Sequence, residues 1–284
     1  MIGLKRRTTL PLGVDLGAEF VSIVASDASS DGFVVKETRT LDVPASDAGT
    51  LDRNIAETVR AILAGFATPE RRCVLAAPSA DVVTRIFRVP PGMRPSEAER
   101  AAALEADTLV DWPASERLVA LDPIPGTRDE MLLSVARNST IERLVAIARA
   151  GGLRPIAVDV PACAWRRAVN DADAVLDLTS DRAVLVIFGT PVGVTHLYAP
   201  RLIDERLAGN VRSALVEARR DGRADVQSLA ILGSPFRYES MEALLRGDGY
   251  ALAPVTLGGI DSPSWTFAYG LASWSVAPRG LHAV

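Results

Sequence analysis

The chain has few cysteines, no excess of basic residues and no long apolar run. Each of these absences excludes a class of protein. Only two of its 284 residues are cysteines, Cys73 and Cys163, and both lie among apolar neighbours. A disulfide framework needs more cysteines than this, so we expect two buried thiols in a reducing cytoplasm. The formal net charge of -4 gives no basic surplus for binding nucleic acid.

No apolar stretch reaches about 18 residues, so the sequence predicts no transmembrane helix. The first residues combine a basic cluster, Lys5 to Arg7, with a short apolar run. That run contains Asp15 and lacks a small-residue cleavage site, so we do not expect a signal peptide. Three positive charges bind an anionic membrane only weakly. The sequence therefore favours a solvated N-terminal segment and a cytoplasmic protein.

Histidine is equally scarce, which limits the candidates for metal binding and catalysis. His196 and His282 are the only two, and they show no metal-ligand spacing with the cysteines. Ser79 has no Gly-x-Ser-x-Gly elbow around it, so hydrolase chemistry is not expected. Trp265 and Trp274 flank the last expected helix. We expect both in the core, with an exposed partner surface as the alternative.

The sequence does contain a regular alternation of strands and helices. Strands are expected at 12–25, 32–43, 71–79, 82–90, 117–124, 130–137 and 154–161, at three places within 173–199, and at 228–235 and 250–257. Helices are expected at 46–66, 96–110, 139–152, 162–169, 202–222, 237–249 and 265–274. Ser96 followed by Glu99 has the spacing of a capping box at the start of the second helix.

A weak internal repeat divides the chain into two related parts. The segment "VDLGAEFVSIVASD" at 14–27 matches "LDLTSDRAVLVIFG" at 176–189 in pattern. In each, an apolar strand ends in an acid, and a tight turn leads into a second apolar strand. A repeat of this kind indicates two α/β halves that face a cleft.

The turn after Asp15 offers chemistry of its own. Successive backbone N–H groups at Leu16, Gly17 and Ala18 can form a nest that binds phosphate oxygens, and glycine lets a ligand approach closely. An acid at the strand end can hold Mg²⁺ through water. The alternative is a plain β-hairpin in which Asp15 caps its own turn.

These motifs, in this order, resemble the actin-like ATPase superfamily and, within it, the PilM family of type IV pilus assembly proteins. The similarity covers nearly the whole chain. Its segments are the two hairpins, the acidic helix at 90–113 with its Glu-Ala step and Trp-Pro end, the helix-turn-strand-helix at 132–169, the strand and glycine turn at 229–235, and the closing helix at 267–273.

The resemblance implies an α/β fold with α+β elements, namely the actin-like (ribonuclease H-like) two-lobed fold with a small inserted α+β domain. It places the first subdomain at 1–80, the inserted domain at 81–150, the return to the first subdomain at 151–172, and the second subdomain at 173–284. The family's nucleotide positions correspond to Asp15, Leu16, Gly17, Ala18, Asp177, Thr179, Gly233 and Ser234.

Several positions depart from the family pattern. Glu19, Phe20 and Ser22 occupy the part of the first hairpin where the family has small hydroxyls and a lysine. A carboxylate beside phosphate is repulsive unless a metal screens it. Thr179 replaces a glycine of the second hairpin, Asp181 adds a negative charge, and Ala183 replaces a hydroxyl. At the adenosine turn only one of two glycines remains, Gly233, followed by Ser234.

A deletion accompanies these substitutions. Between the second hairpin and the adenosine strand the family carries a subdomain that covers the base and ribose, and here roughly one helix remains. No change supplies a substitute positive charge. The sequence therefore predicts vestigial nucleotide positions, weak or lost ATP binding and no catalytic residue or metal site. No cofactor is expected, with ATP and Mg²⁺ as the open alternative.

The resemblance implies a scaffold of a type IV pilus, a type II secretion system or a competence pseudopilus. Such a scaffold binds the short N-terminal cytoplasmic tail of a bitopic inner-membrane protein, and it reaches the membrane only through that partner. Self-association stays open, and no nucleic acid is expected. The alternatives are an active ATPase or sugar kinase of the same superfamily, and a secretion-platform domain of the kind fused to a membrane helix.

Overall fold

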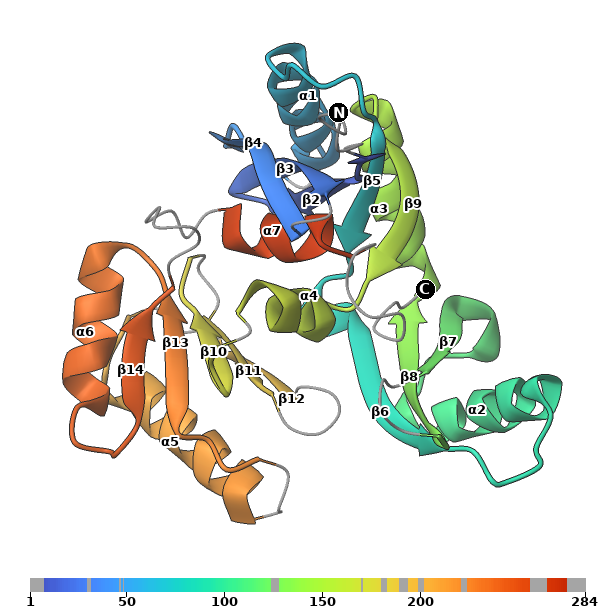
Figure 1. Ribbon diagram of the computed structural model, residues 1–284, viewed down its shortest axis with the longest axis vertical. Helices are drawn as coiled ribbons and strands as arrows, with labels where there is room; N and C mark the ends of the chain where they lie inside the picture. The colour runs from blue at the N-terminus through green and yellow to red at the C-terminus, as the bar shows by residue number, and fades with distance from the viewer. Residues whose placement is uncertain are drawn as a thin grey trace, which may run out of the picture. The chain divides into compact units, whose positions relative to one another are not determined.

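The fold was analysed in a computed structural model of the chain (Figure 1). The structure describes residues 8–29, 32–45, 47, 49–123, 128–169, 171–179, 183–188, 194–198, 202–220, 224–255 and 265–274. The chain forms two compact units, one of Met1–Arg167 with Phe267–Val284 and one of Ala168–Thr266. Each unit is an α/β structure with its own sheet, which confirms the expected fold class.

The main sheet of the first unit contains six strands: β1 (Thr8–Thr9), β2 (Leu12–Leu16), β3 (Phe20–Ser29), β4 (Gly32–Asp42), β5 (Arg72–Ala76) and β9 (Arg154–Asp159). β3 pairs antiparallel with β1, β2 and β4, whereas β2 pairs parallel with β5, and β5 with β9. The expected strand at 12–25 is thus divided by the turn at 17–19, as the strand-turn-strand motif predicts.

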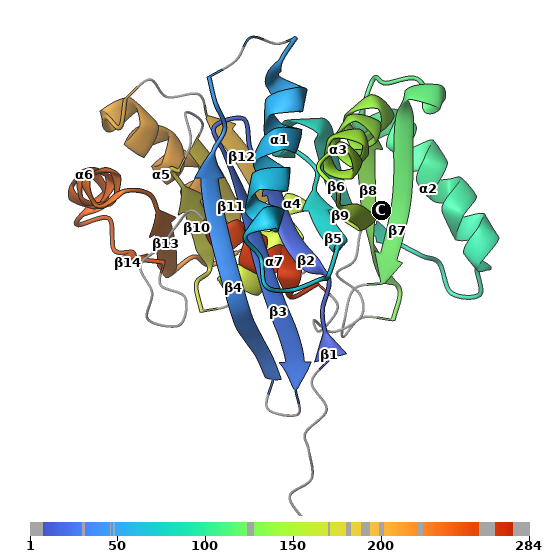
Figure 2. The same cartoon turned by 90° about the horizontal axis from the view of Figure 1, so that it is seen from above.

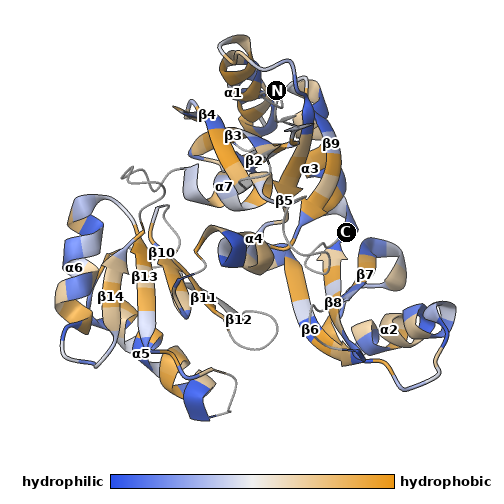
Figure 3. Cartoon of the chain, in the orientation of Figure 1, coloured by the Kyte–Doolittle hydropathy of each residue, from blue (hydrophilic) through white to orange (hydrophobic). Residues whose placement is uncertain are grey.

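Helices cover both faces of this sheet (Figure 2). On one face, α1 (Leu51–Ala64) and α3 (Asn138–Ala150) bury apolar side chains such as Ile55 and Ile141 against the strands. On the other face, Ala164 of α4 (Pro161–Ala168) and Leu271 of α7 (Thr266–Ala272) pack on Val74 of β5. The strands are coloured mainly as apolar and the helices carry hydrophilic stretches (Figure 3), as expected for a buried sheet.

The inserted region forms a three-stranded antiparallel sheet in the order β6 (Val82–Arg88), β8 (Glu130–Arg137), β7 (Arg117–Pro123), with α2 (Pro95–Leu109) on one face. Alternate side chains of a strand point to opposite faces. The odd-numbered residues, among them Leu133 and Val135, contact α2. The even-numbered residues form what we call the second face: Thr84, Ile86, Ala120, Asp122, Leu132 and Ser134.

The start of α2 differs from the expected capping box. The helix begins at Pro95, and Glu97 rather than Glu99 accepts the hydrogen bond from the backbone N–H of Arg94, at 3.0 Å. The prediction that Ser96 opens the helix was therefore wrong by a single position at the helix start. Proline fits the first helical position because it needs no N–H partner there.

The second unit repeats the topology of the first. Its sheet has the order β12 (Val194–Tyr198), β11 (Ala183–Ile187), β10 (Ala174–Asp177), β13 (Ser228–Leu232), β14 (Ala251–Pro254). β10 pairs antiparallel with β11 and parallel with β13, just as β2 pairs with β3 and β5. The helices α5 (Glu205–Arg220) and α6 (Pro235–Leu245) pack on this sheet.

The division into units differs from the expected boundaries at both ends. The second unit begins at Ala168 rather than 173, and α7 joins the first unit from Phe267 onward instead of staying with residues 173–266. The reason is the packing of Phe267, Leu271 and Trp274 on the first sheet. The assignment of particular segments as actin-like subdomains stays a prediction.

Burial in the structure bears on the expectations for the cysteines and tryptophans. Cys73 and Cys163 are free thiols, both buried, and burial raises the pKa of each to about 12. Trp265 is buried and Trp274 is half-buried against the first sheet. No helix within the described residues is long and apolar enough to cross a membrane.

Candidate functional site

The first hairpin turn is closed by backbone contacts. A Cβ at Gly17 would lie 2.6 Å from the carbonyl oxygen of Phe20, so this turn requires glycine. The carbonyl of Glu19 accepts a hydrogen bond from the N–H of Val43 at 2.8 Å, and the Glu19 residue is exposed. The turn is thus anchored to the end of β4 while its acid faces solvent.

The residues beside this turn are largely engaged with the sheet. Asp15 is half-buried and lies opposite Ser22 in the register of β2 and β3. The buried hydroxyl of Ser22 hydrogen bonds to the hydroxyl of Thr40 on β4 at 2.7 Å. Leu16 and Gly17 are half-buried, and Ala18 is exposed. Phosphate binding at these positions stays a prediction.

In the second hairpin, the acid caps its own turn. One carboxylate oxygen of Asp177 accepts hydrogen bonds from the Thr179 N–H at 2.9 Å and from the Thr179 hydroxyl at 2.6 Å. Burial raises the pKa of Asp177, and the hydrogen bonds from Thr179 oppose that rise. The alternative that was considered for Asp15, an acid that caps its own turn, is thus found at the second hairpin. Thr179, at the position of the family glycine, adds a hydroxyl donor to the backbone N–H.

The turn at Gly233, which the resemblance assigns to adenosine, lies directly beside the second hairpin. Leu178 donates its N–H to the carbonyl of Leu232 at the end of β13, at 2.8 Å. A Cβ at Gly233 would lie 3.3 Å from the Cβ of Leu178. Ser234 then caps α6, accepting a hydrogen bond from the Arg237 N–H at 3.4 Å. The structure therefore brings Asp177, Thr179, Gly233 and Ser234 together, while Asp15 to Ala18 belong to the other unit.

Arg237 is a member of this cluster that the sequence reasoning missed. Its Nη1 donates to the carbonyl of Leu178 at 2.5 Å, and its charge, like the hydrogen bonds from Thr179, opposes the rise in the pKa of Asp177 that burial causes. The expectation that none of the changes from the family pattern supplies a substitute positive charge stays a prediction, because Arg237 is bonded to the chain's own carbonyl here. The available signal was its position three residues after the helix cap Ser234, which places it in the first turn of α6.

A buried charge pair lies at the end of β9 in the first unit. Arg167 of α4 pairs with Asp159, and both side chains are almost fully buried. The other Asp159 oxygen accepts from the N–H of Val160 at 2.8 Å, and Arg167 Nε donates to the carbonyl of Gly270 in α7 at 2.9 Å. Burial lowers the pKa of Arg167 to about 10. The pair joins β9, α4 and α7.

Within the described residues, the other candidate side chains do not come together in a further site. Among the described residues, no group of three or more His, Cys, Asp or Glu side chains could hold a metal ion. Ser79 lies in a single short turn, residues Ser79–Asp81, before β6. The backbone of His196 lies in β12, and Asp181 and His282 fall outside the described residues.

Comparisons with known proteins agree on the architecture. A solved PilM-PilN type IV pilus biogenesis complex contains a chain that matches with a TM-score of 0.74 and 19% identity, over 94% of this chain and 99% of that one. The cytoplasmic domain of EpsL, an inner-membrane component of the type II secretion system of Vibrio cholerae, matches with a TM-score of 0.61 and 12% identity, over 95% and 96%.

A third solved structure extends the likeness beyond secretion and pili. It is a Bacteroides thetaiotaomicron protein of unknown function with an actin-like ATPase fold, with a TM-score of 0.52 and 10% identity, over 93% and 95% of the two chains. At these identities the matches establish the fold, which is actin-like. The PilM match extends over 99% of the solved chain. The shortened second half stays a prediction.

Comparison with curated proteins and with family models completes the assignment. No curated protein matches this chain. The family model for type IV pilus assembly protein PilM matches residues 13–198. That range includes both hairpins, the inserted sheet with α2, and the buried charge pair. It spans more than half of the sequence, and the chain therefore belongs to the family of the type IV pilus assembly protein PilM.

Proposed function

We propose that this chain is a cytoplasmic scaffold of a type IV pilus or a related secretion or competence platform. In this role it binds the short N-terminal cytoplasmic tail of a bitopic inner-membrane protein and reaches the inner membrane only through that partner. Family membership supports the pilus assignment, and the similar PilM chain was solved in a complex with PilN.

The observation that carries the proposal is the inserted sheet. α2 covers only one of its faces, and salt bridges such as Arg85–Glu105, at 2.9 Å, join helix and strand on that side. On the second face, Leu132 and Ser134 at the centre are fully buried and Ile86 at the edge is 37% exposed. The even-numbered residues next to this face, Val82, Leu118 and Ala136, merge with the main core of the first unit. A partly apolar face of this kind suits an extended tail that buries a few side chains.

The nucleotide positions support binding that is weak or absent. The first turn exposes Glu19, whose charge opposes phosphate. In the second unit, Asp177 is already engaged by Thr179. Arg237 is engaged by the carbonyl of Leu178. A phosphate group would have to replace these contacts, so the residues fit Mg²⁺-ATP incompletely.

Calorimetric titration tests both parts of the proposal. The protein is titrated with Mg²⁺-ATP up to millimolar concentration and, separately, with a synthetic peptide of the tail encoded beside it. We expect heat of binding from the peptide and none from ATP. Saturable ATP binding at micromolar concentration would contradict the loss of the nucleotide site, and no peptide binding would contradict the scaffold.

An active ATPase or sugar kinase is the second candidate, and one observation favours it. Asp177, Thr179, Gly233, Ser234 and Arg237 gather where β10 and β13 end and α6 begins. A helix start with a nearby arginine favours anions. The same titration decides the matter, because an enzyme of this class must bind Mg²⁺-ATP measurably at millimolar concentration.

A further inference from the structure

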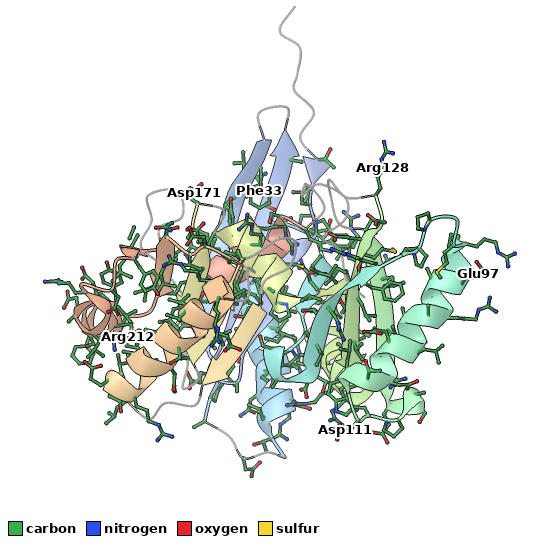
Figure 4. The ribbon with its side chains drawn as sticks, turned by 90° about the horizontal axis from the view of Figure 1, so that it is seen from below. Phe33, Glu97, Asp111, Arg128, Asp171 and Arg212 are labelled. Atoms are coloured by element: carbon green, nitrogen blue, oxygen red, sulfur yellow. The ribbon has the colours of Figure 1, made fainter. Side chains whose placement is uncertain are left out.

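The side of α2 that faces away from the inserted sheet carries an exposed apolar residue among charges. The inner side of the helix buries Ala102 and Ala106 against the sheet. On the outer side, residues spaced three or four apart are all exposed, and we call them the outer stripe: Ser96, Arg100, Ala103, Leu104 and Asp107. Leu104 is 70% exposed, so most of an apolar side chain contacts water. Figure 4 labels Glu97 near the start of α2 and Asp111 just beyond its end, on the outside of the inserted region.

Opposite charges lie at the two ends of the outer stripe. Arg100 and Asp107 are seven residues apart, which is two helical turns and roughly 10 Å along the axis. They point in the same direction but are too far apart to pair with each other. Among the described residues Arg100 forms no ion pair, whereas Asp107 pairs with Arg117 and is still 58% exposed. Both charges are therefore available to a molecule that lies along the stripe.

A second copy of the same stripe has the complementary order of charges. Ala103 and Leu104 lie midway between Arg100 and Asp107. When a second α2 packs antiparallel about a two-fold axis at this midpoint, Arg100 of each copy faces Asp107 of the other. The two Leu104 side chains meet beside the axis, and the small side chain of Ala103 lets the helices approach. The stripe is thus complementary to itself in charge and in apolar surface.

We propose that α2 is the interface of a homodimer, in which two copies of this chain pair antiparallel through Arg100, Leu104 and Asp107. One helix per copy makes a small interface, so the dimer is weak in free solution and forms where many copies are gathered on one assembly. The inference goes beyond the proposed function and does not depend on it. α2 and the second face lie on opposite sides of the inserted sheet, so each copy keeps its second face.

Sedimentation velocity of the full-length protein, from micromolar to near-millimolar concentration, measures self-association. We expect the weight-average sedimentation coefficient of the wild type to rise with concentration. Leu104→Asp places two carboxylates beside the two-fold axis, and Arg100→Asp places an acid opposite Asp107. Because symmetry applies each change twice, we expect either substitution to lower the association constant at least about 10-fold.

Leu202→Asp and Arg128→Asp are the matched controls. Leu202 is 72% exposed, close to the value for Leu104, but it precedes α5 in the second unit. Arg128 is exposed in the turn before β8 and extends away from the strands (Figure 4). Each control should leave the association constant within about threefold of the wild type. Thermal unfolding of every variant separates loss of self-association from loss of folding.

Disulfide cross-linking tests the position of the two-fold axis. Cys73 and Cys163 are buried, so a thiol introduced on the outer stripe reacts in preference to them. Under mild oxidation, Leu104→Cys should form a linked dimer on a non-reducing gel, because the two copies of this position meet beside the axis. Leu202→Cys, in the same protein at the same concentration, should give at least about 10-fold less linked dimer.

Three outcomes would overturn the inference. The first is a wild-type protein that stays monomeric up to near-millimolar concentration. The second is self-association that Leu104→Asp and Arg100→Asp leave unchanged, and the third is cross-linking by Leu104→Cys that does not exceed that by Leu202→Cys. A Leu104→Cys variant that cross-links in cells only to a different protein would assign the outer stripe to that protein and would overturn the homodimer as well.

Discussion

At the scale of single residues, the carboxylate of Asp122 affects how the stability of the folded protein depends on pH. Burial raises the pKa of Asp122 from 3.8 to about 6. Above pH 6 the folded protein holds an ionised carboxylate that the unfolded chain solvates better. As the pH falls through 6, the folded state takes up a proton first and gains stability, and the gain is complete below 3.8.

We therefore expect Asp122→Asn to stabilise the protein near neutral pH. Because the residue is half-buried and partly screened, the gain at pH 7.5 should be about 1 kcal/mol. It should shrink between pH 6 and pH 4. Urea unfolding of both proteins across this range measures it. A gain that is the same at pH 4 as at pH 7.5 would show that ionisation of Asp122 is not its cause.

The nucleotide positions also show, residue by residue, what a sequence can predict. The pattern of an acid at a strand end identified Asp177 and Thr179, and the structure places them in hydrogen-bond contact. Arg237 was missed because its role depends on α6 starting at Pro235 beside Leu178, and those contacts lie 59 residues apart in the chain. Local patterns do not specify such distant pairs.

At the scale of elements, β2 and α7 lie in close backbone contact in the first unit. A Cβ at Gly13 would overlap the carbonyl oxygen of Ala268 and the backbone nitrogen of Ala272. Helix and strand approach this closely only because Gly13 has no side chain. Phe33 of β4 adds an edge-on contact with Tyr269 of the same helix, with ring centres 5.0 Å apart.

Gly13→Ala should therefore displace α7 and destabilise the protein by about 3 kcal/mol, the upper end of the range for overpacked cores. Chemical denaturation measures the change. Gly209→Ala is the control, because a Cβ at this position in α5 would meet nothing within 4 Å. That change should be neutral or stabilise by roughly 0.5–1 kcal/mol. Equal effects of the two substitutions would show that α7 does not constrain Gly13.

Most elements were predictable, because apolar periodicity and turn residues are local signals. The strands and helices follow the expected ranges closely, including the glycine end of α3 at Gly151 and Gly152. The predicted start of α2 was misplaced, because both Ser96 and Pro95 are suited to the start of a helix. The hydrogen bond from the Arg94 N–H to Glu97 shows that the helix begins at Pro95. The second face was beyond local patterns, because strand pairing creates it.

At the scale of the whole molecule, the first unit is discontinuous in sequence. Its strands come from the first 159 residues, and α7 is added after the second unit has been completed. The chain passes between the units after Arg167 and before Phe267. Near both crossings, Trp165 and Phe267 stack with ring centres 4.9 Å apart, and Arg167 bonds to Gly270.

Truncation of the chain after Val255 should therefore destabilise the first unit. The truncated chain keeps every other helix and strand of that unit and loses only α7. Val74 and Ala164 lose their contact with Leu271, and the Arg167 guanidinium loses the Gly270 carbonyl. We expect a lower Tm and binding of a dye for apolar surface. Truncation after Trp274 keeps α7 and serves as the control. Unchanged unfolding of the shorter chain would show that α7 is dispensable.

The discontinuous first unit also imposes an order on biosynthesis. A ribosome adds about 5–20 residues per second and domains generally fold as units. The face of β2 and β5 that α7 covers is complete once Ala76 has been added, whereas α7 begins at Thr266. Even after α4 has packed on Val74, this face lacks α7 until the end of elongation, and we expect chaperones that bind growing chains to associate with it.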